Sequence, residues 1–597
     1  MNNSLLQHNV DLTPYLTFGI AAKARLFAEY SSLKELERIA KMPAFNNNQL
    51  FHIGGGSNLL IFDTFNGMVL HSRIKGIQEY KKNEEEYYII AGAGEKWTDL
   101  VDWCVEHGYS GMECMAGIPG EVGAAPVQNV GAFGSEAKDV IFSVECFDVE
   151  NKTTVKFTND QCGFSYRNSK FKGVWKNRYF VLRVSFKLKK STEAENLTYE
   201  KLKTFANSLG RIPTIREIRD EVIRLRSLRL PDPAVIGSAG SFFKNPIIHK
   251  NYFADEVLRR CPDIPCYEVD YRRVKLPAGW LIEHAGLKGK RIGGAEVYPD
   301  NCLVIINRGD ATAENVKTLS EKIENTVRME YGVTLEPEVN FVDTNIDVTV
   351  LGTGTSKGIP EIGCDCKVCT SEDPHDKRLR SSILVKTMGL RILIDASPDF
   401  RYQAIKNDIN NVDALLLTHV HYDHVGGMDD LRPFCLNGDI PVYCREDVDR
   451  DLRKRIDYCF RDSKYPGVPG FETHIITDRP FVVKGLRVIP VNVHHGNLPI
   501  VGYRIGDFAY VTDCKTIPDE EKIKLKGLKV LILNALRDRD HFAHLTIDEC
   551  VEIIKDLQPE KAYITHLCHE AGLHRVLSDR LPEGVEPAYD GEVIHVS

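Results

Sequence analysis

The chain has 597 residues, of which 43% are hydrophobic and 27% are charged, and its formal net charge at pH 7 is −8. This is an ordinary globular composition, and at ~100–200 residues per domain it allows about three to five domains. The negative charge argues against a general nucleic-acid binder, and no apolar run reaches the ~18 residues that a membrane-spanning helix needs.

The first residues and the cysteines bear on the cellular compartment. Residues 1–8 have neither a basic start nor an apolar core, so we expect no secretion signal. Sixteen cysteines are scattered along the chain, apart from a tight group at Cys364, Cys366 and Cys369. Without a signal, most of them should be reduced thiols. The sequence therefore predicts a cytoplasmic protein without membrane insertion, whose partners are small molecules.

Strands and helices are mixed in the first half of the chain. Strands are predicted at 50–53 and 87–91, and helices at 97–107, 213–230 and 315–331. The second helix stops before Pro231 and Pro233, and the third stops at Gly332, as helices do before proline and at a C-terminal glycine.

Two glycine-rich segments stand out in this half. Gly54-Gly55-Gly56-Ser57-Asn58 lets backbone N–H groups converge on a phosphate, although a tight turn explains it equally well. The run from Gly117 to Gly134 has little side-chain bulk and suits a planar, anionic ligand wrapped by main chain. It does not follow G-x-G-x-x-G, so a dinucleotide fold other than the Rossmann fold is implied. The candidate cofactor-binding residues are Gly54, Gly55, Gly56, Ser57, Asn58, Gly117, Ile118, Pro119, Gly120, Gly123, Ala124, Gln128, Asn129, Gly131 and Ala132.

Ordered landmarks make the first half resemble the UDP-N-acetylenolpyruvoylglucosamine reductase (MurB) family. Besides the two glycine-rich segments they are Thr17-Phe18-Gly19-Ile20, Tyr166-Arg167-Asn168-Ser169, Leu230-Pro231-Asp232-Pro233, Gly240-Ser241-Phe242-Phe243-Lys244-Asn245-Pro246 and Leu335-Glu336-Pro337-Glu338-Val339. The resemblance covers almost all of residues 10–341. It implies an FAD-binding domain over 1–210, completed by 326–344, and a substrate-binding domain over 211–325.

The chemistry of that family implies roles for three residues. NADPH reduces FAD, and the reduced flavin delivers hydride to C3 of an enolpyruvyl ether, which leaves negative charge beside a carboxylate and a need for a proton at C2. By resemblance, Ser241 donates the proton, Arg167 binds the carboxylate and Glu338 acts beside them, with Glu336 as the runner-up. Taken singly, each is a common turn, surface or strand-end residue. Their joint appearance in one family frame favours the catalytic interpretation.

The substrate-binding residues also come from the resemblance. Tyr199 corresponds to a tyrosine that closes over the UDP-sugar, and Arg229 stands where the family commonly has lysine near the diphosphate. That departure keeps the charge and changes the geometry. Tyr166, Asn245 and Asn301 complete the predicted set. A flavin oxidase or dehydrogenase acting on sugar alcohols is the rival, and it is disfavoured because no histidine for covalent flavin attachment is evident.

The pattern changes at 342–346, where we place a boundary, and 345–597 should form a further domain. Strands are predicted at 347–351, 383–385, 391–394, 414–417, 530–533 and 562–564. One of them ends at Thr418-His419-Val420-His421-Tyr422-Asp423-His424. Three histidines and an aspartate so close together at a strand end are costly to bury unless they bind a ligand, and alternation distributes them around two adjacent cations.

The H-x-H-x-D-H pattern is the hallmark of the metallo-β-lactamase superfamily, which implies an αββα sandwich with further ligands at later strand ends. His494 and His495 compete for one position, and His495 is preferred because a His-Gly-x-Leu-Pro run begins there. Asp395 is expected to brace a ligand from behind. The first metal would be bound by His419, His421, His495 and Asp513, and the second by Asp423, His424, Asp513 and His566.

The cysteine group narrows the choice of reaction class. Two adjacent cations activate water near neutral pH, which suits phosphodiesters, thioesters and lactams alike. The C-x-C-x-x-C spacing, together with His569, makes a closed tetrahedral zinc site, with unliganded thiols as the alternative. This combination resembles the PhnP family of phosphoribosyl 1,2-cyclic phosphate phosphodiesterases over 347–597. The resemblance implies that Cys364, Cys366, Cys369 and His569 bind zinc and that His544 assists at the phosphate, whereas 445–480 has no clear counterpart.

The sequence thus predicts a multidomain α+β protein with two active halves. The first is an NADPH- and FAD-dependent reductase that makes UDP-N-acetylmuramate, and the second is a phosphodiesterase with a pair of Mn²⁺ or Zn²⁺ ions and a separate structural Zn²⁺. For the second half the alternatives are a glyoxalase II-like thioesterase, a tRNA-processing nuclease and a non-catalytic scaffold. No basic arm for tRNA stands out, and a scaffold would need an incomplete ligand set.

Overall fold

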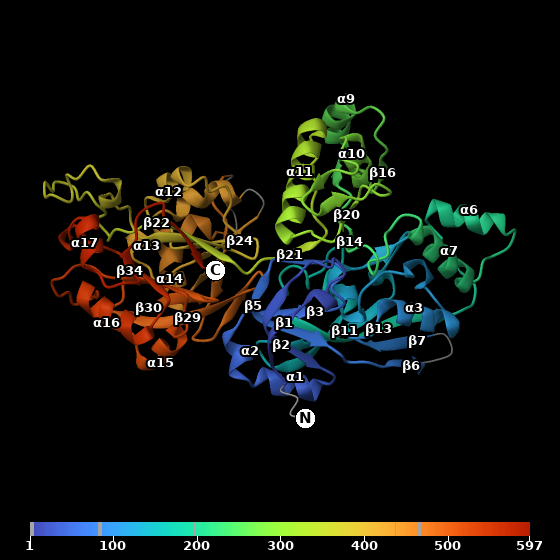
Figure 1. Ribbon diagram of the computed structural model, residues 1–597, viewed down its shortest axis with the longest axis horizontal. Helices are drawn as coiled ribbons and strands as arrows, with labels where there is room; N and C mark the ends of the chain where they lie inside the picture. Colours follow the sequence, from blue (N-terminus) through green and yellow to red (C-terminus); the bar gives the residue numbers. More distant parts are fainter. Residues whose placement is uncertain (1–4, 82–85, 195–196, 436–437, 462–466, 597) are drawn as a thin grey trace. The chain divides into compact units, whose positions relative to one another are not determined.

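The computed structural model describes residues 5–81, 86–194, 197–435, 438–461 and 467–596 (Figure 1). The chain divides into two compact units, Met1–Val342 and Asp343–Ser597, and each contains helices and strands. The expected multidomain α+β class is confirmed. Among the described helices, none is both long enough and apolar enough to cross a membrane.

A mixed sheet at the start of the first unit leads into the first glycine-rich segment. Its strands run in the order β1 (Gln7–Asp11), β2 (Lys23–Tyr30), β5 (Thr64–Ser72) and β3 (Leu50–Ile53), and the last three are parallel. Helix α1 (Leu33–Ala40) buries Leu36 and Ile39 in the adjoining core. The strand predicted at 50–53 is therefore confirmed, and Gly54 follows at its carboxyl end.

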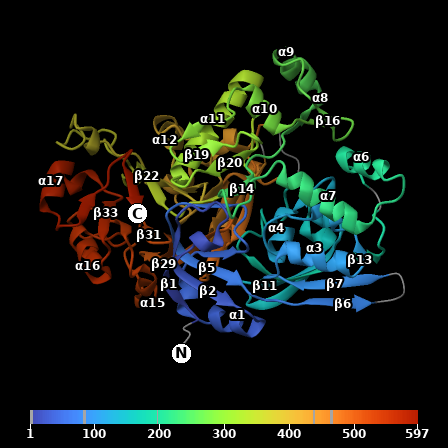
Figure 2. The ribbon, with the colours of Figure 1, turned by 45° about the vertical axis from the view of Figure 1, so that its right-hand side comes forward.

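The second glycine-rich segment packs on an antiparallel sheet. That sheet has the order β12 (Thr153–Thr158), β11 (Ile141–Asp148), β13 (Tyr179–Lys190), β7 (Tyr87–Gly92) and β6 (Ile77–Lys81). Helices α3 (Trp97–Glu106) and α7 (Ile215–Ser227) lie side by side and bury apolar side chains in the same core (Figure 2). Helix α7 begins at a capping box between Thr214 and Glu217, inside the predicted range 213–230.

A smaller sheet follows, in the order β14 (Ser238–Ser241), β20 (Val304–Asn307), β19 (Ala295–Val297) and β18 (Arg291–Ile292). Helices α10 (Ala278–His284) and α11 (Ala313–Tyr331) cover its core, and α11 ends at Gly332 with φ of 71°, as predicted. Strand β21 (Asn340–Val342) then pairs in parallel with β4 (Leu59–Ile61). This pairing returns the chain to the Gly54–Asn58 loop, so that the residues just before β21 lie beside it.

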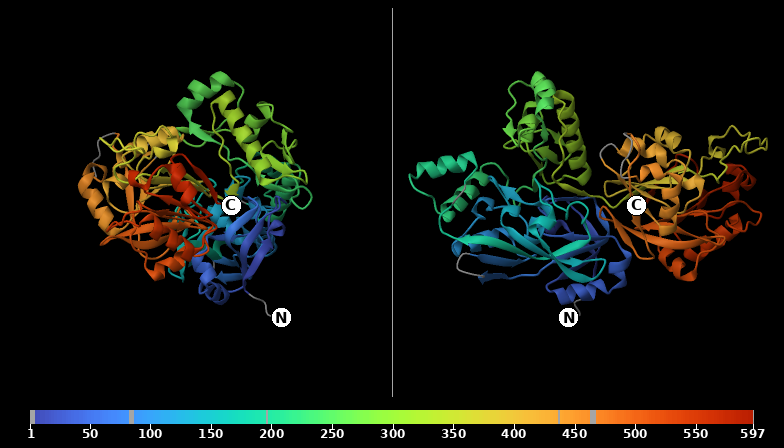
Figure 3. Two further views of the ribbon diagram at one scale, coloured as in Figure 1. Left: turned by 60° about the vertical axis from the view of Figure 1, so that its left-hand side comes forward. Right: turned by 180° about the vertical axis from the view of Figure 1, so that it is seen from behind.

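The second unit is an αββα sandwich (Figure 3). Helices α12 (Phe400–Lys406) and α14 (Glu446–Arg455) cover the outer face of one sheet, and α16 (Ile547–Leu557) covers the other. One sheet has the order β27 (Phe471–Ile475), β26 (Ile440–Cys444), β25 (Ala414–Leu416), β24 (Leu390–Ile394), β23 (Ser382–Thr387), β22 (Ile346–Gly352) and β35 (Val593–Val596). The other has the order β28 (Phe481–Val483), β29 (Leu486–His495), β30 (Leu498–Ile505), β31 (Phe508–Val511), β32 (Val530–Asn534), β33 (Lys561–Thr565) and β34 (Val585–Pro587).

Parallel pairing positions the chemistry of this unit. Strands β24 to β27 are parallel, as are β31 to β34, so each group presents its carboxyl ends at one sheet edge. Asp395, Asp513 and His566 follow such ends, and the H-x-H-x-D-H motif follows β25. All the predicted strands of this half are present, with ends shifted by one or two residues.

Candidate functional site

The two glycine-rich segments of the first unit meet face to face. A Cβ atom added at Gly55 would lie 2.9 Å from Gly120 Cα, and the Ser57 hydroxyl donates to the Pro119 carbonyl oxygen at 3.0 Å. Gly56 and Gly120 have φ of 58° and 125°, which glycine adopts without steric cost. The main chains form a narrow cradle of backbone groups that fits phosphate oxygens and a flat ring system.

Not every predicted cofactor residue turns its side chain to this cradle. Asn129 is wholly buried, and its amide donates to Glu136 Oε2 at 3.1 Å and to the Ser165 carbonyl oxygen at 2.9 Å. Its carbonyl oxygen accepts from the Lys138 N–H. The Asn129 side chain is thus fully used in shaping the loop.

A buried charge network behind the cradle was missed from the sequence. His71 Nδ1 lies 2.9 Å from Glu29 Oε1, and His71 Nε2 lies 3.1 Å from Glu121 Oε1. Burial disfavours the imidazolium, but the Glu121 hydrogen bond and charge, with Glu29, outweigh it and raise the pKa of His71. Glu121 is the single charged residue of the 117–134 run, and that was the available signal.

Arg167 and Glu338 form the polar centre of the predicted reductase site. Arg167 Nε lies 3.0 Å from Glu338 Oε1, and these side chains are 19% and 14% exposed. Another Arg167 nitrogen donates to the Gly131 carbonyl oxygen at 2.6 Å, which ties the guanidinium to the second glycine-rich segment. The backbone N–H of Glu338 donates to the Phe242 carbonyl oxygen at 2.7 Å, so Glu338 is docked beside Ser241. Glu336 instead pairs with Lys244 and is 72% exposed.

A cleft of about 310 Å³ gathers most of the predicted substrate residues. Tyr166 is outside its lining but hydrogen-bonds Asn245, which belongs to it, and Lys275 Nζ lies 5.4 Å from the Tyr166 ring centroid. Burial, with the neighbouring charge of Arg167, lowers the pKa of Arg226 to about 10. Arg226 and Lys201 add positive charge that the sequence did not single out. The lining residues are Phe133, Tyr199, Lys201, Leu225, Arg226, Arg229, Leu230, Ser241, Asn245 and Asn301.

In the second unit the strand ends bring distant ligands together. Helix α13 (Tyr422–Val425) turns the chain back, so that the ring centroids of His419 and His424 lie 4.2 Å apart. Asp513 lies between two histidines, with one oxygen 3.1 Å from His424 Nε2 and the other 3.0 Å from His566 Nε2. Asp423 Oδ2 lies 3.3 Å from His424 Nε2. The carboxylate of Asp513 is therefore placed to bridge two positions.

His421 and His495 form the other side of this cluster. The ring centroid of His421 is 4.6 Å from that of His419 and 5.1 Å from that of His495. His495 Nδ1 lies 2.9 Å from the Ala543 carbonyl oxygen, which can only accept, so Nδ1 carries the proton and Nε2 keeps a free lone pair. His495, and not His494, joins the ligand clusters found among the described residues.

The donor set fits metal ions. His419, His424, Asp513 and His566 are at most 2% exposed. Within the described part of the chain, His419 Nε2, His424 Nε2 and both ring nitrogens of His566 are buried without a hydrogen-bond partner. Burial lowers the pKa of His419 and keeps it neutral, as a ligand must be. Unpaired buried imidazoles beside carboxylates are costly unless they coordinate a cation.

Asp395 supports the cluster from behind. Its carboxylate accepts from the Thr418 N–H at 2.9 Å, from the Thr418 hydroxyl at 2.8 Å and from His424 Nδ1 at 2.7 Å, which turns His424 Nε2 towards Asp513. Asp395, Asp513 and His566 have φ of 61°, 58° and 59°. This left-handed conformation costs a non-glycine residue about 1–2 kcal/mol and is typical of functional sites.

His544 borders the open side of the cluster. Its ring centroid lies 4.5 Å from that of His495 and 4.9 Å from that of His566, and its Nδ1 is 3.8 Å from Asp513 Oδ1. Burial lowers the pKa of His544 to about 3. His541 lies 4.9 Å from His544, ring to ring, and was not predicted, although the H-x-x-H spacing offered the signal.

The predicted thiol site is assembled separately. His569 Nδ1 lies 3.1 Å from Cys364 Sγ and 3.5 Å from both Cys366 Sγ and Cys369 Sγ. The backbone N–H of Cys369 donates to Cys366 Sγ and lowers the pKa of that thiol to about 6. Three sulfurs and one nitrogen at one point fit a tetrahedral zinc ion.

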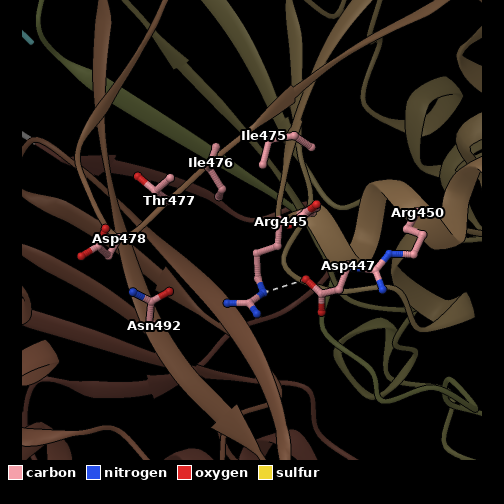
Figure 4. A pocket seen from close by; sticks show the side chains of 9 residues that line it. Arg445, Asp447, Arg450, Ile475, Ile476, Thr477, Asp478 and Asn492 are labelled. Atoms are coloured by element: carbon pink, nitrogen blue, oxygen red, sulfur yellow. Dashed lines mark hydrogen bonds and ion pairs between the residues drawn. The ribbon is translucent and has the colours of Figure 1, made fainter.

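A different cleft in this unit lacks such chemistry. It has a volume of about 550 Å³ at the carboxyl ends of β26 and β27 (Figure 4). Arg445 and Asp447 point towards each other across it, with 3.0 Å between Arg445 Nε and Asp447 Oδ1. None of its described lining residues carries a buried, unpaired polar atom. The histidine cluster, not this cleft, therefore carries the reactive groups.

Three family descriptions match the chain. Residues 24–158 match "FAD binding domain", residues 232–342 match "UDP-N-acetylenolpyruvoylglucosamine reductase, C-terminal domain", and residues 390–567 match "Beta-lactamase superfamily domain". A diphosphatase from the PhnP family is a similar solved structure, with 40% identity, a TM-score of 0.40, and coverage of 42% of this chain and 98% of that chain. The MurB reductase of Thermus caldophilus is another, with 26% identity, a TM-score of 0.39, and coverage of 56% and 99%.

Curated relatives extend over the whole first unit. The UDP-N-acetylenolpyruvoylglucosamine reductase of Neisseria gonorrhoeae is 43% identical over 345 residues, which are 58% of this chain and 99% of that protein. The reductase of Flavobacterium johnsoniae is 39% identical over 338 residues, which are 56% and 99%. The chain therefore belongs to the UDP-N-acetylenolpyruvoylglucosamine reductase family and continues into a metallo-β-lactamase-fold domain.

Proposed function

We propose that the first unit reduces UDP-N-acetylenolpyruvoylglucosamine to UDP-N-acetylmuramate with NADPH, using FAD held by the glycine-rich cradle. The observation that carries this proposal is the Arg167–Glu338 pair docked beside Ser241. When bound, FAD supplies the two-electron chemistry. The cationic cleft with Arg226 and Arg229 suits the diphosphate of the substrate.

The protein's own groups then have distinct tasks. Arg167 presents a planar fork to the enolpyruvyl carboxylate, and Glu338 holds that fork in place. The Ser241 hydroxyl donates a proton to C2, and the neighbouring Phe242 and Phe243, each 1% exposed, keep water away. Negative charge that develops beside the carboxylate is stabilised by the guanidinium.

The test separates two half-reactions. Anaerobic NADPH should bleach the flavin of the purified full-length chain, and UDP-N-acetylenolpyruvoylglucosamine should restore its colour. Ser241→Ala should slow restoration by about 10²–10⁴-fold and leave bleaching unchanged, because proton donation enters only the second step. A colourless protein after native purification would overturn the proposal, and rapid restoration by oxygen alone would favour a flavin oxidase.

We propose that the second unit is a metal-dependent phosphodiesterase acting on a small cyclic phosphate or related diester. The observation that carries this proposal is the convergence of His424 and His566 on the two oxygens of Asp513, through buried nitrogens that make no hydrogen bond within the described residues. When bound, a pair of Mn²⁺ or Zn²⁺ ions supplies a nucleophile and Lewis acidity. The ligands would be His419, His421, His495, Asp513, Asp423, His424 and His566.

Two further elements complete this proposal. His544, neutral and beside His495, can donate a hydrogen bond to a phosphoryl oxygen. Cys364, Cys366, Cys369 and His569 would hold a structural zinc that joins the loop after β22 to the loop after β33.

A substrate screen tests this assignment. Metal-loaded full-length chain should hydrolyse bis(p-nitrophenyl) phosphate and cyclic ribose phosphates, and a His421→Ala, Asp423→Ala double variant should lose that activity. Hydrolysis of lactoylglutathione or of precursor tRNA at the higher kcat/KM would instead favour the thioesterase or the nuclease. Activity that survives the double change would overturn the metal assignment.

A further inference from the structure

Glu338 is held by more groups than its pair with Arg167. Gln128 Nε2 donates to Glu338 Oε1 at 3.0 Å, the oxygen that Arg167 also contacts. Gln128 Oε1 in turn accepts from Lys172 Nζ at 3.0 Å. Lys172 Nζ also reaches the Glu338 carbonyl oxygen at 3.5 Å, where Asn58 Nδ2 donates at 3.0 Å. Lys172 thus contacts Glu338 twice, once through Gln128 and once at the backbone.

The chemistry of the ammonium group fixes the orientation of the amide. Lys172 carries three N–H donors and no acceptor, so only the oxygen of the Gln128 amide can face it. The NH₂ end of that amide must then face Glu338. A rotated amide would place N–H against the ammonium and C=O against the carboxylate, which are two repulsive contacts in a largely buried site. Lys172 therefore determines which end of Gln128 meets Glu338.

We propose that Lys172 is a positioning residue of the reductase, which acts through Gln128 to orient the Glu338 carboxylate against Arg167. The inference rests on the proposed reductase function and adds a residue to it. No substrate atom contacts Lys172 in this scheme. The sequence gives no hint of it, because nothing distinguishes Lys172 from the neighbouring Lys170 and Lys176.

The charges around Lys172 make the role depend on pH. Burial and the nearby Lys244 lower the pKa of Lys172 to about 8, although Glu338 and Glu336 act in the opposite direction. Lys176 also faces it, and lowers its pKa further. As pH rises through that value, the group becomes a neutral amine that can accept a hydrogen bond, and the amide of Gln128 is no longer fixed. Restoration of flavin colour by substrate should therefore decline on the alkaline side.

Three variants test this relay in the full-length holoprotein. Lys172→Met should slow restoration of flavin colour by substrate by about 10²-fold, as displaced catalytic groups do, while bleaching by NADPH is unchanged. Lys172→Arg retains a cation without an acceptor, so it should recover most of the rate and move the alkaline decline to higher pH. The matched control is Lys176→Met, because burial also lowers the pKa of Lys176 but no described contact links it to Glu338. At neutral pH it should restore flavin colour at the wild-type rate, and only its alkaline decline should move, to higher pH, because a charge that lowers the pKa of Lys172 is gone.

A binding measurement supplies an independent readout. Calorimetry of UDP-N-acetylmuramate binding in buffers of different ionisation enthalpy reports the protons exchanged on binding. Lys172→Met should change the number of protons exchanged near pH 8, and Gln128→Met should change it in the same direction. This readout uses binding and not turnover, so it still applies if one of the variants retains little FAD. If Lys172→Met shows wild-type proton exchange and a wild-type pH profile, this inference is overturned and the proposed reductase function is not. A wild-type flavin that substrate cannot reoxidise would overturn the proposed reductase function, and this inference with it.

Discussion

His424 Nδ1 donates to Asp395 Oδ2 at 2.7 Å, and neither side chain is exposed to solvent. Because the same carboxylate also binds the N–H and hydroxyl of Thr418, the imidazole is held with Nε2 towards Asp513. We expect Asp395→Asn to weaken metal binding by about 10–100-fold, the usual effect of losing a carboxylate behind a histidine ligand. Calorimetric titration of metal-stripped protein with Mn²⁺ or Zn²⁺ measures this.

Asp413→Asn is the matched control for that change. Asp413 also accepts a backbone N–H, from Arg391 at 2.9 Å, but contacts none of the cluster residues among its described partners. The metal affinity of the Asp413→Asn variant should equal that of the wild-type protein. Equal affinities for the Asp395 and Asp413 variants would show that Asp395 does not orient His424.

The thiol site should hold its metal more tightly than the histidine cluster does. Cys366→Ser removes one of the sulfurs that converge on His569, so a chelator-resistant zinc present in wild type should be lost. The thermal midpoint of the second unit should fall, because the metal joins two loops. Elemental analysis after chelator dialysis measures the zinc. Cys568→Ser, next to His569 but outside the cluster, should retain it.

Gly55 has no room for a side chain. A Cβ there would lie 2.9 Å from Gly120 Cα, so Gly55→Ala must push the two glycine-rich segments apart. Overpacking of this kind costs about 1–3 kcal/mol, and we expect FAD affinity to fall by about tenfold or more. Flavin absorbance per chain after gel filtration reports the loss. Gly173→Ala is the control, because its nearest atom would be 3.7 Å away, and retained flavin in Gly55→Ala would contradict the close approach.

The His71 network predicts a pH-dependent stability. A histidine whose folded-state pKa exceeds its usual value of about 6.5 adds to the free energy of unfolding. This contribution is complete below about pH 6.5 and is lost as pH rises through the folded-state pKa. The pKa of His71 is raised, so the thermal midpoint of the flavin-bound first unit should fall as pH rises above the usual histidine value of about 6.5. His71→Gln should flatten that slope, as followed by flavin fluorescence.

His52→Gln is the control for that experiment. Burial lowers the pKa of His52 to about 3, so the folded histidine is neutral while the unfolded one is protonated below its usual pKa of about 6.5. His52 therefore raises stability as pH increases towards about 7, and His52→Gln should make the fall steeper, opposite to the effect of His71→Gln. An unchanged slope in His71→Gln would contradict the ion-pair account of Glu29, His71 and Glu121.

Sequence reasoning succeeded where the chemistry is local. The residues of the Gly54–Asn58 segment and of the H-x-H-x-D-H motif are consecutive, so their spacing alone predicts a phosphate cradle and a metal site. Further ligands were expected at later strand ends, and Asp513 and His566 do follow the ends of parallel strands. Family membership of the first unit was predicted from ordered landmarks and is confirmed by its relatives.

The other site residues depend on contacts between segments that are far apart in the sequence. Glu336 and Glu338 flank one proline, and the family resemblance favoured Glu338; the ion pairs of Glu338 with Arg167 and of Glu336 with Lys244 agree with that preference. Glu121 and Lys172 look like surface charges in the sequence, because nothing local records that His71 or Gln128 will pack against them. Partners far apart along the chain leave no pattern in a single sequence.

The left-handed conformations of Asp395, Asp513 and His566 bear on how this unit can change. Asparagine adopts those angles at less cost than other non-glycine residues, so Asp513→Asn should make the metal-free protein more resistant to heat while it weakens the ligand set. Asp395 differs, because its carboxylate accepts three buried hydrogen bonds whose loss would exceed the gain in the backbone. At Asp513 the backbone therefore sets thermal stability against the proposed metal binding.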